Sequence, residues 1–215
     1  MTTRTKIGFL SILCLSTISA AEAQTANPYA KPSPAPTSAA QAKDIPMDNL
    51  TSFATGGTRI LESVKGDLTG DGRSGVLLVL DPPLAGKEKL GEGPNREIAL
   101  LTRDDAGALH KATSNAHIVP CSHCGGIAGD PYAYSRIGKG EFTIVTGGGS
   151  RERWTDEFTF TYVGAKKDWF VSTVIRKVVD TEGDKEKHVT LTARDLGETP
   201  FSAFDPSHLP EVTLP

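Results

Sequence analysis

Cysteine is scarce in this chain, and lysine and arginine form no cluster. Three cysteines in 215 residues cannot supply a disulfide framework, and a chain of this length buries enough surface to fold without one. The formal net charge is −3, so the sequence gives little electrostatic reason to bind nucleic acid or anionic lipid. No apolar run reaches the roughly 20 residues that a bilayer-spanning helix needs, which argues against an integral membrane span.

The motifs of common hydrolases are missing as well. The sequence contains no H-E-x-x-H and no G-x-S-x-G, and it shows no Ser, His and Asp constellation. These absences favour a non-catalytic protein over an enzyme. An enzyme remains the alternative, because catalytic residues can be assembled from distant parts of a chain.

The N-terminus has the layout of a secretory signal peptide. Arg4 and Lys6 precede a largely apolar stretch at residues 7–20, and Ala-Glu-Ala at residues 21–23 provides the small residues of a cleavage site. We therefore predict a signal peptide over residues 1–23. A periplasmic or secreted location follows from it.

The mature chain is predicted to consist of a spacer and one domain. Residues 24–43 are dominated by Pro, Ala, Ser and Thr, so they can bury too little apolar surface to offset the entropy of ordering. They are predicted to form a disordered spacer. Residues 44–215 are predicted to form a single β-rich domain.

Alternating polarity is the strongest structural signal in that domain. In residues 151–163 four aromatic side chains share one parity, and Asp156 alone interrupts them. This period of two is typical of a strand with one buried face. A short link at residues 164–167 leads to residues 168–179, which are rich in β-branched and aromatic types, so the two runs are predicted to form a hairpin. The other predicted strands are residues 58–64, 75–80, 97–102, 109–112, 132–137, 141–146 and 188–193.

The fold class follows from this pattern and from the many turn residues. The chain contains 22 glycines and 14 prolines, and no convincing amphipathic helix is present. We expect a mainly β protein, either an antiparallel β sandwich or a strongly twisted open sheet, with few or no helices. Residues 84–90 can form one short turn at most, and residues 196–215 are expected to pack as an irregular tail.

A calcium loop is the sharpest local motif. Asp67, Thr69 and Asp71 place side-chain oxygens at alternating positions, and Arg73 can add its backbone carbonyl. Such oxygens, with a glycine that permits a sharp turn, are the ligands that Ca²⁺ takes. An EF-hand is excluded, because Leu78 occupies the position of its bidentate glutamate. The alternative is a plain hairpin turn, in which Asp and Gly are favoured without an ion.

Residues 66–75, GDLTGDGRSG, contain this loop and resemble the calcium loops of FG-GAP and VCBS-type repeats. In those repeats the loop reads approximately D-x-N-x-D-G-x-x-D before an apolar strand. The resemblance implies a structural calcium ion that rigidifies a turn. This chain departs from the pattern at Thr69 and Gly75, and no second copy occurs at a fixed period. A longer stretch, about residues 117–175, is similar to uncharacterised exported bacterial β-rich proteins, which implies no activity.

The pair Cys121 and Cys124 is the second candidate site. In an oxidising compartment two cysteines spaced C-x-x-C are expected to form a disulfide. A redox dithiol normally lies at the start of a helix, where the thiol pKa is lowered, and here glycines follow the pair. A metal site with His117 and His123 is the third possibility, since zinc accepts nitrogen and sulfur ligands. The disulfide is the favoured prediction.

A glycine-rich segment at residues 146–150 is the third feature. Consecutive glycines followed by Arg151 and Arg153 can aim donors at an anion. No P-loop lysine or helix follows, so a turn that joins two strands is favoured.

Together these features favour an exported, non-catalytic β domain that binds a protein, a glycan or an envelope component. The alternative is an extracytoplasmic enzyme. It would be a thiol oxidoreductase acting through the C-x-x-C pair, or a hydrolase using Asp67, Asp71, Asp130 or His123. The sequence identifies neither the ligand nor an oligomeric state. Calcium is the only cofactor that it suggests.

Overall fold

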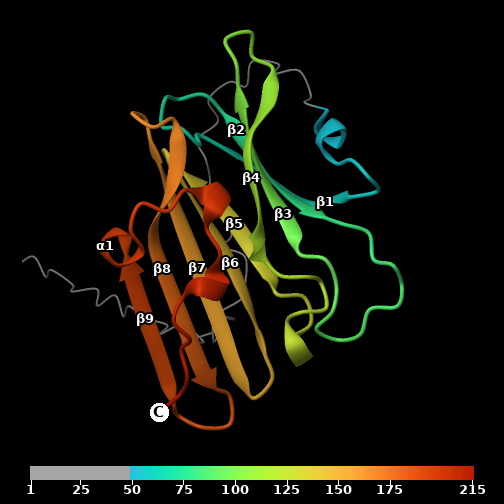
Figure 1. Cartoon of the computed structure of the whole chain (residues 1–215), viewed down its shortest axis with the longest axis vertical. Coiled ribbons are helices and arrows are strands. Elements are labelled where there is room, and N and C mark those ends of the chain that lie inside the picture. Colours follow the sequence, from blue (N-terminus) through green and yellow to red (C-terminus); the bar gives the residue numbers. More distant parts are fainter. Residues whose placement is uncertain (1–48) are drawn as a thin grey trace, which may run out of the picture. The chain divides into compact units, whose positions relative to one another are not determined.

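Two antiparallel sheets, each built from strands that are consecutive in the sequence, make up the fold (Figure 1). The computed structural model describes residues 49–215, all of which belong to one compact unit. The predicted signal peptide and spacer lie outside the described residues. The four-stranded sheet contains β1 (Arg59–Gly66), β2 (Gly75–Asp81), β3 (Arg96–Arg103) and β4 (Leu109–Val119). The five-stranded sheet contains β5 (Tyr132–Gly138), β6 (Glu141–Gly149), β7 (Glu152–Val163), β8 (Asp168–Asp180) and β9 (Glu186–Thr192).

The predicted mainly β fold is confirmed, and the antiparallel sandwich is the alternative that forms. The predicted hairpin is β7 and β8, which pair from Glu152↔Asp180 to Val163↔Asp168. The prediction for β4 was too short, because the strand continues past Ala112 to Val119. Among residues 49–215 no helix is long and apolar enough to cross a membrane.

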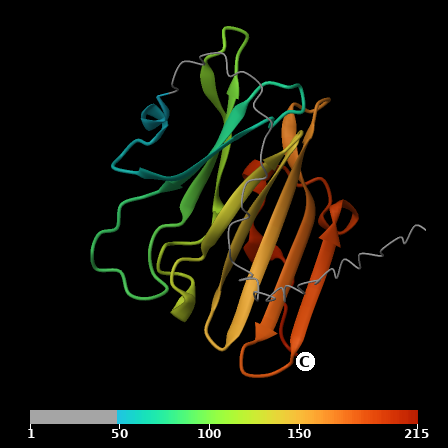
Figure 2. The same cartoon turned by 180° about the vertical axis from the view of Figure 1, so that it is seen from behind.

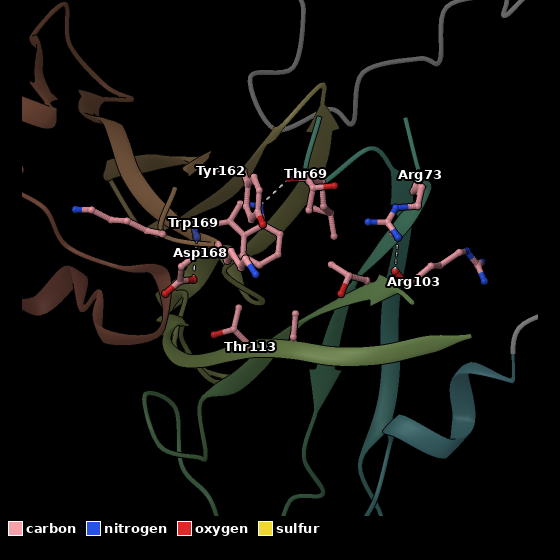
Figure 3. Close-up of a pocket in the computed structure, with 13 residues that line it drawn as sticks. Thr69, Arg73, Arg103, Thr113, Tyr162, Asp168 and Trp169 are labelled. Carbon is pink, nitrogen blue, oxygen red and sulfur yellow. Dashed lines mark hydrogen bonds between the residues drawn. The ribbon is translucent and has the colours of Figure 1, made fainter. Parts of the chain in front are cut away.

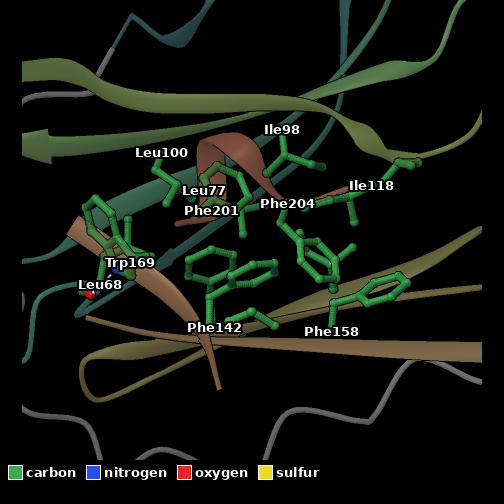
Figure 4. Packing of buried hydrophobic residues seen from close by; sticks show 14 of the residues in the cluster. Leu68, Leu77, Ile98, Leu100, Ile118, Phe142, Phe158, Trp169, Phe201 and Phe204 are labelled. Atoms are coloured by element: carbon green, nitrogen blue, oxygen red, sulfur yellow. Dashed lines mark hydrogen bonds between the residues drawn. The ribbon is translucent and has the colours of Figure 1, made fainter. Parts of the chain in front are cut away.

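A shared core joins the two sheets. The alternation along β7 buries Phe158 and Phe160, which are at most 1% exposed, on the face toward the four-stranded sheet. Leu77, Ile98 and other aliphatic side chains of that sheet complete the same cluster. Burial of this kind is the dominant favourable term in folding. Figure 4 shows Leu77, Ile98 and Phe158 between the two sheets.

The four-stranded sheet is apolar on both faces, which explains the uninterrupted run in β2. Every residue of β2 is buried. Val76, Leu78 and Leu80 belong to a second cluster with Ala99 and Leu101, against which the 3₁₀ turn η1 (Leu50–Phe53) packs. A strand that is covered on both faces has no reason to alternate.

Residues 197–215 pack without a strand or an α-helix, as expected of an irregular tail, and residues 200–209 form a wedge between the two sheets that the sequence did not predict. After α1 (Ala193–Leu196), the chain makes two 3₁₀ turns, η3 (Phe201–Ala203) and η4 (Pro206–His208). Phe201 and Phe204 are 0% and 3% exposed and pack against the aromatic rings of the five-stranded sheet. These turns (red) lie in front of that sheet in Figure 1 and behind it in Figure 2.

Candidate functional site

The predicted calcium loop is closed by hydrogen bonds from its own backbone. The two carboxylate oxygens of Asp67 accept the N–H groups of Gly70 and Gly72 at 2.7 and 3.0 Å. Asp71 accepts the backbone N–H of Arg73 at 2.9 Å and its Nε–H at 2.8 Å. These two hydrogen bonds lower the pKa of Asp71, despite some opposing desolvation. The loop as it stands is a turn braced by two carboxylates.

Calcium binding at this loop stays a prediction. Its oxygen donors would be the carboxylates of Asp67 and Asp71, the hydroxyl of Thr69 and the carbonyl of Arg73. The guanidinium of Arg73 lies on the carboxylate of Asp71, so an ion would have to displace it. Within residues 49–215, no group of three or more His, Cys, Asp and Glu side chains is placed to hold a metal ion.

Cys121 and Cys124 lie at disulfide distance, with their sulfur atoms 2.05 Å apart. Cys121 is fully buried, and only a three-residue 3₁₀ turn, η2 (Gly126–Ala128), follows the pair. The backbone N–H of Gly91 donates to the carbonyl of His123 at 2.8 Å. The disulfide segment therefore braces the loop between β2 and β3. Paired cysteines offer no free thiolate to a metal or a substrate.

The glycine segment is strand rather than turn, which corrects the prediction for residues 146–150. Gly148 in β6 lies opposite Trp154 in β7. A Cβ at Gly148 would lie 2.8 Å from Cζ2 of Trp154 and 2.8 Å from the carbonyl oxygen of Gly125. Glycine is therefore required, because the indole and a neighbouring loop both pack directly on the backbone there.

Arg151 follows this segment and pairs with Asp180 at the end of β8. Its Nε and an Nη atom donate to the two oxygens of that carboxylate, each at 3.0 Å. The backbone N–H of Glu182 adds a third hydrogen bond. The guanidinium of Arg151 and the N–H of Glu182 lower the pKa of Asp180 to about 2. The guanidinium of Arg151 therefore pairs with a carboxylate of the protein itself and not with an external anion.

The ion pair between Asp180 and Arg151 predicts a contribution to the free energy of unfolding that is lost in acid. A carboxyl whose pKa falls from 3.8 to about 2 on folding stabilises the protein above pH 4, and the stabilisation disappears as the pH falls toward 2. The unfolding midpoints in urea of wild type and Asp180→Asn should therefore differ at pH 7 and converge between pH 4 and pH 2. A difference that does not change with pH would contradict this assignment.

A groove at one end of the sandwich has a volume of about 700 Å³. We call it the tryptophan groove. Trp154, Asp156 and Arg176 from β7 and β8 form one wall, and the end of β4 forms another. The full lining is Asn95, His117, Ile118, Pro120, Thr146, Glu152, Trp154, Asp156, Phe158, Arg176, Val178, Asp205, Pro206, Ser207, Glu211, Val212 and Thr213.

Asp156 and Arg176 form a rigid ion pair in this groove. Nε and Nη2 of Arg176 each donate to one carboxylate oxygen of Asp156 at 3.0 Å, and Nη1 donates to the carbonyl of Pro210 at 2.9 Å. Asp156 is only 6% exposed. Burial raises the pKa of its carboxyl, and the opposing effect of Arg176 is smaller. Asp156, which interrupts the aromatic residues on one face of β7, is thus a buried acid that is paired with Arg176.

A second cleft, of about 350 Å³, lies at the other end of β7. We call it the basic cleft, because four cationic side chains and one acidic side chain line it. In Figure 3, Arg73 and Arg103 lie on one side, and Tyr162, Asp168 and Trp169 on the other. The full lining is Leu68, Thr69, Arg73, Gly75, Thr102, Arg103, Ala112, Thr113, Tyr162, Lys166, Lys167, Asp168 and Trp169.

Three other candidate residues, Asp130, His117 and His123, lie in different surroundings. Asp130 accepts a hydrogen bond at 2.6 Å from the buried guanidinium of Arg96. His117 lies 3.6 Å from Asp205 at the tryptophan groove, and His123 lines a separate hollow beside Arg59. Asp67, Asp71 and Asp130 line none of the three hollows described here, and His117 and His123 line different ones.

No protein-family model, curated protein or solved structure matches this chain. The resemblance to FG-GAP and VCBS-type loops therefore stays a prediction that rests on residues 66–75.

Proposed function

We propose that this protein is an exported, non-catalytic binding module that holds a glycan in the tryptophan groove. The observation that carries the proposal is the combination, in one groove of about 700 Å³, of a tryptophan with a buried, bidentate Asp–Arg pair. Ligand pockets typically combine an apolar, aromatic lining with a few fixed polar groups. The predicted signal peptide agrees with a ligand outside the cytoplasm.

Trp154 supplies a fixed apolar surface. Its indole lies against the backbone of Gly148, so the ring is held in place on one side, and the residue is only partly buried. The C–H faces of sugar rings are apolar and pack on aromatic rings, and an immobilised indole loses little entropy on binding. The ring is thus suited to stack against a pyranose.

The polar lining suits hydroxyl groups. A sugar hydroxyl donates one hydrogen bond and accepts others, so it needs acceptors and donors close together. Asp156 and Glu152 offer acceptors, while Arg176 and Asn95 offer N–H donors. The charges of Asp156 and Arg176 compensate each other, which favours a neutral sugar over an ionic ligand at this point of the groove.

Tryptophan fluorescence tests the proposal directly. The chain has two tryptophans, and Trp169 is 2% exposed with its Nε1–H donated to the carbonyl of Leu68 at 2.7 Å. A ligand in the groove should therefore change the emission of Trp154 alone. Soluble oligomers of N-acetylglucosamine and of glucose are the probes. We expect a saturable change with at least one of them.

Trp154→Ala should weaken that binding about 30-fold, since tryptophans at the centre of an interface commonly contribute about 2 kcal/mol. Binding by the variant is measured by calorimetry. Tyr162→Ala is the matched control: it removes an aromatic residue of the same parity at the other end of β7 and should leave affinity unchanged. The proposal fails if no oligosaccharide binds or if Trp154→Ala binds as tightly as wild type. Chromatographic detection of shortened oligomers would instead support a hydrolase.

A further inference from the structure

We propose that the basic cleft is a second binding site, which takes an anionic group such as a phosphate or a carboxylate. This site is independent of the glycan proposal, because Trp154 and Tyr162 place the two clefts at opposite ends of β7. Three segments that are distant in sequence supply its cations. Arg73 comes from the loop between β1 and β2, Arg103 from the end of β3, and Lys166 and Lys167 from the turn between β7 and β8.

The backbone at Lys167 is the first observation that points to a ligand. Its φ is 52°, and it is the only non-glycine residue with a positive φ in residues 49–215. The turn is closed by hydrogen bonds from the N–H of Lys166 to Val163 O at 2.9 Å and from the N–H of Lys167 to Gly164 O at 3.3 Å. Glycine adopts this conformation without the steric cost that a lysine bears. A strained residue that lines a cleft is a candidate for function.

The charge of Lys167 is the second observation. Within the described part of the chain, its ammonium makes no ion pair, whereas Lys166 contacts Glu198 and Arg73 contacts Asp71. A lysine that is placed at a backbone cost and lines a cleft without a carboxylate partner is available to an external anion.

The remaining lining can complete the coordination of an anion. The hydroxyls of Thr69, Thr102 and Thr113 are donors at the same cleft. Ion pairs with Asp71, at 2.8 Å, and with Asp105, at 3.3 Å, restrain Arg73, and its guanidinium also donates to the carbonyl of Arg103 at 3.3 Å. Charge-assisted hydrogen bonds from restrained cations are the strong ones in anion recognition. The volume of about 350 Å³ accommodates a phosphate or carboxylate group together with part of the molecule that carries it.

Lys167→Gly tests the proposal because it separates stability from binding. Glycine removes the backbone strain, so the melting temperature should rise by about 2–4 °C, the shift typical of a modest stabilisation at this chain length. The same variant should bind the anion about tenfold more weakly, because the unpaired cation is gone. Lys167→Arg keeps the charge and should retain affinity. Lys187→Ala, on β9, is the control for an equal loss of charge away from the cleft.

Two kinds of probe, small anions and anionic polymers, distinguish the sources of the anion. Inorganic phosphate and acetate, titrated by calorimetry and by chemical-shift changes of the Lys167 amide, report a free small anion. Polygalacturonate and poly(glycerol phosphate) report an acidic substituent of a polymer. Tighter binding of a polymer than of the matching small anion assigns the site to polymers, and the reverse assigns it to free anions.

The inference is overturned if no probe binds at millimolar concentration, or if Lys167→Gly gains stability and keeps full affinity. Trp154→Ala should leave anion binding unchanged. Loss of anion binding in Trp154→Ala would show that the two clefts depend on each other and would contradict their proposed independence. Failure of the glycan probes in wild type, with anion binding intact, would remove the proposed function and leave this inference standing.

Discussion

Replacing Arg96 with methionine should lower the free energy of unfolding by about 3–5 kcal/mol, the usual cost of removing one partner from a buried ion pair. Arg96 is fully buried at the start of β3. Its Nε donates to Asp81 at 2.7 Å, and its Nη2 donates to Asp130 at 2.6 Å. Methionine preserves much of the volume, so the loss reports the charge and the hydrogen bonds rather than a cavity.

The pKa shifts of Arg96 and Asp81 explain why Arg96 needs both Asp81 and Asp130. Burial alone would lower the pKa of Arg96, but Asp130 and Asp81 outweigh it and raise that pKa above its usual value. Burial likewise opposes ionisation of Asp81, and Arg96 and Arg59 together hold its pKa below the usual value. Without Arg96, the carboxylate of Asp81 would remain at the end of β2 with only an exposed partner.

Arg59→Met is the matched control for this prediction. Arg59 donates to the same carboxylate of Asp81, at 2.7 Å, but its side chain is 70% exposed. An exposed ion pair contributes about 0–1 kcal/mol, so this variant should be nearly as stable as wild type. Denaturant unfolding followed by circular dichroism measures both variants. Equal losses in the two would refute the assignment. If Arg96→Met does not fold, Asp130→Asn provides the comparison and should lose stability by a smaller amount.

Local patterns predicted the presence of every strand, although β4 and β6 extend beyond their predicted ends. The alternation in residues 151–163 identified β7 and the buried parity of Phe158 and Phe160, because a strand that faces a core on one side repeats every two residues. The uninterrupted apolar run of β2 identified a strand but not its second covered face. Asp156 interrupts the aromatic residues of β7, and an acid among core aromatics needs a partner, but the local pattern did not identify that partner as Arg176.

The remaining features depend on partners that are distant in sequence. Arg96 meets Asp130 across 34 residues, and nothing near Arg96 marks it as buried. The prolines of the C-terminal segment suggested an irregular tail, although Phe201 and Phe204 enter the core. The strain at Lys167 is a property of its backbone angle, which no pattern of residue types reveals.

Asn115→Ala should lower the free energy of unfolding by about 3 kcal/mol, because Asn115 ties the C-terminal wedge to β4. Its Nδ2 group donates to the carbonyls of Phe201 and Phe204 at 2.6 and 2.8 Å. Its Oδ1 accepts the N–H groups of His117 and Ile118 at 2.7 and 3.2 Å. The side chain is 3% exposed, so alanine would remove four hydrogen bonds to the backbone, three of them buried. Unfolding in urea gives the magnitude.

A double-mutant cycle with Phe201→Ala distinguishes local damage from release of the wedge. Phe201→Ala alone should cost about 3–5 kcal/mol, since it removes a fully buried aromatic ring. If the segment detaches as a unit, the first substitution already loses what the second would remove, and the double variant should cost at least 1 kcal/mol less than the sum. Simple additivity would mean that each residue acts only locally.

Asn115 lies between Thr113, which lines the basic cleft, and His117, which lines the tryptophan groove. Release of the wedge should therefore weaken ligand binding at both ends of β7, which a purely local loss of hydrogen bonds would not do.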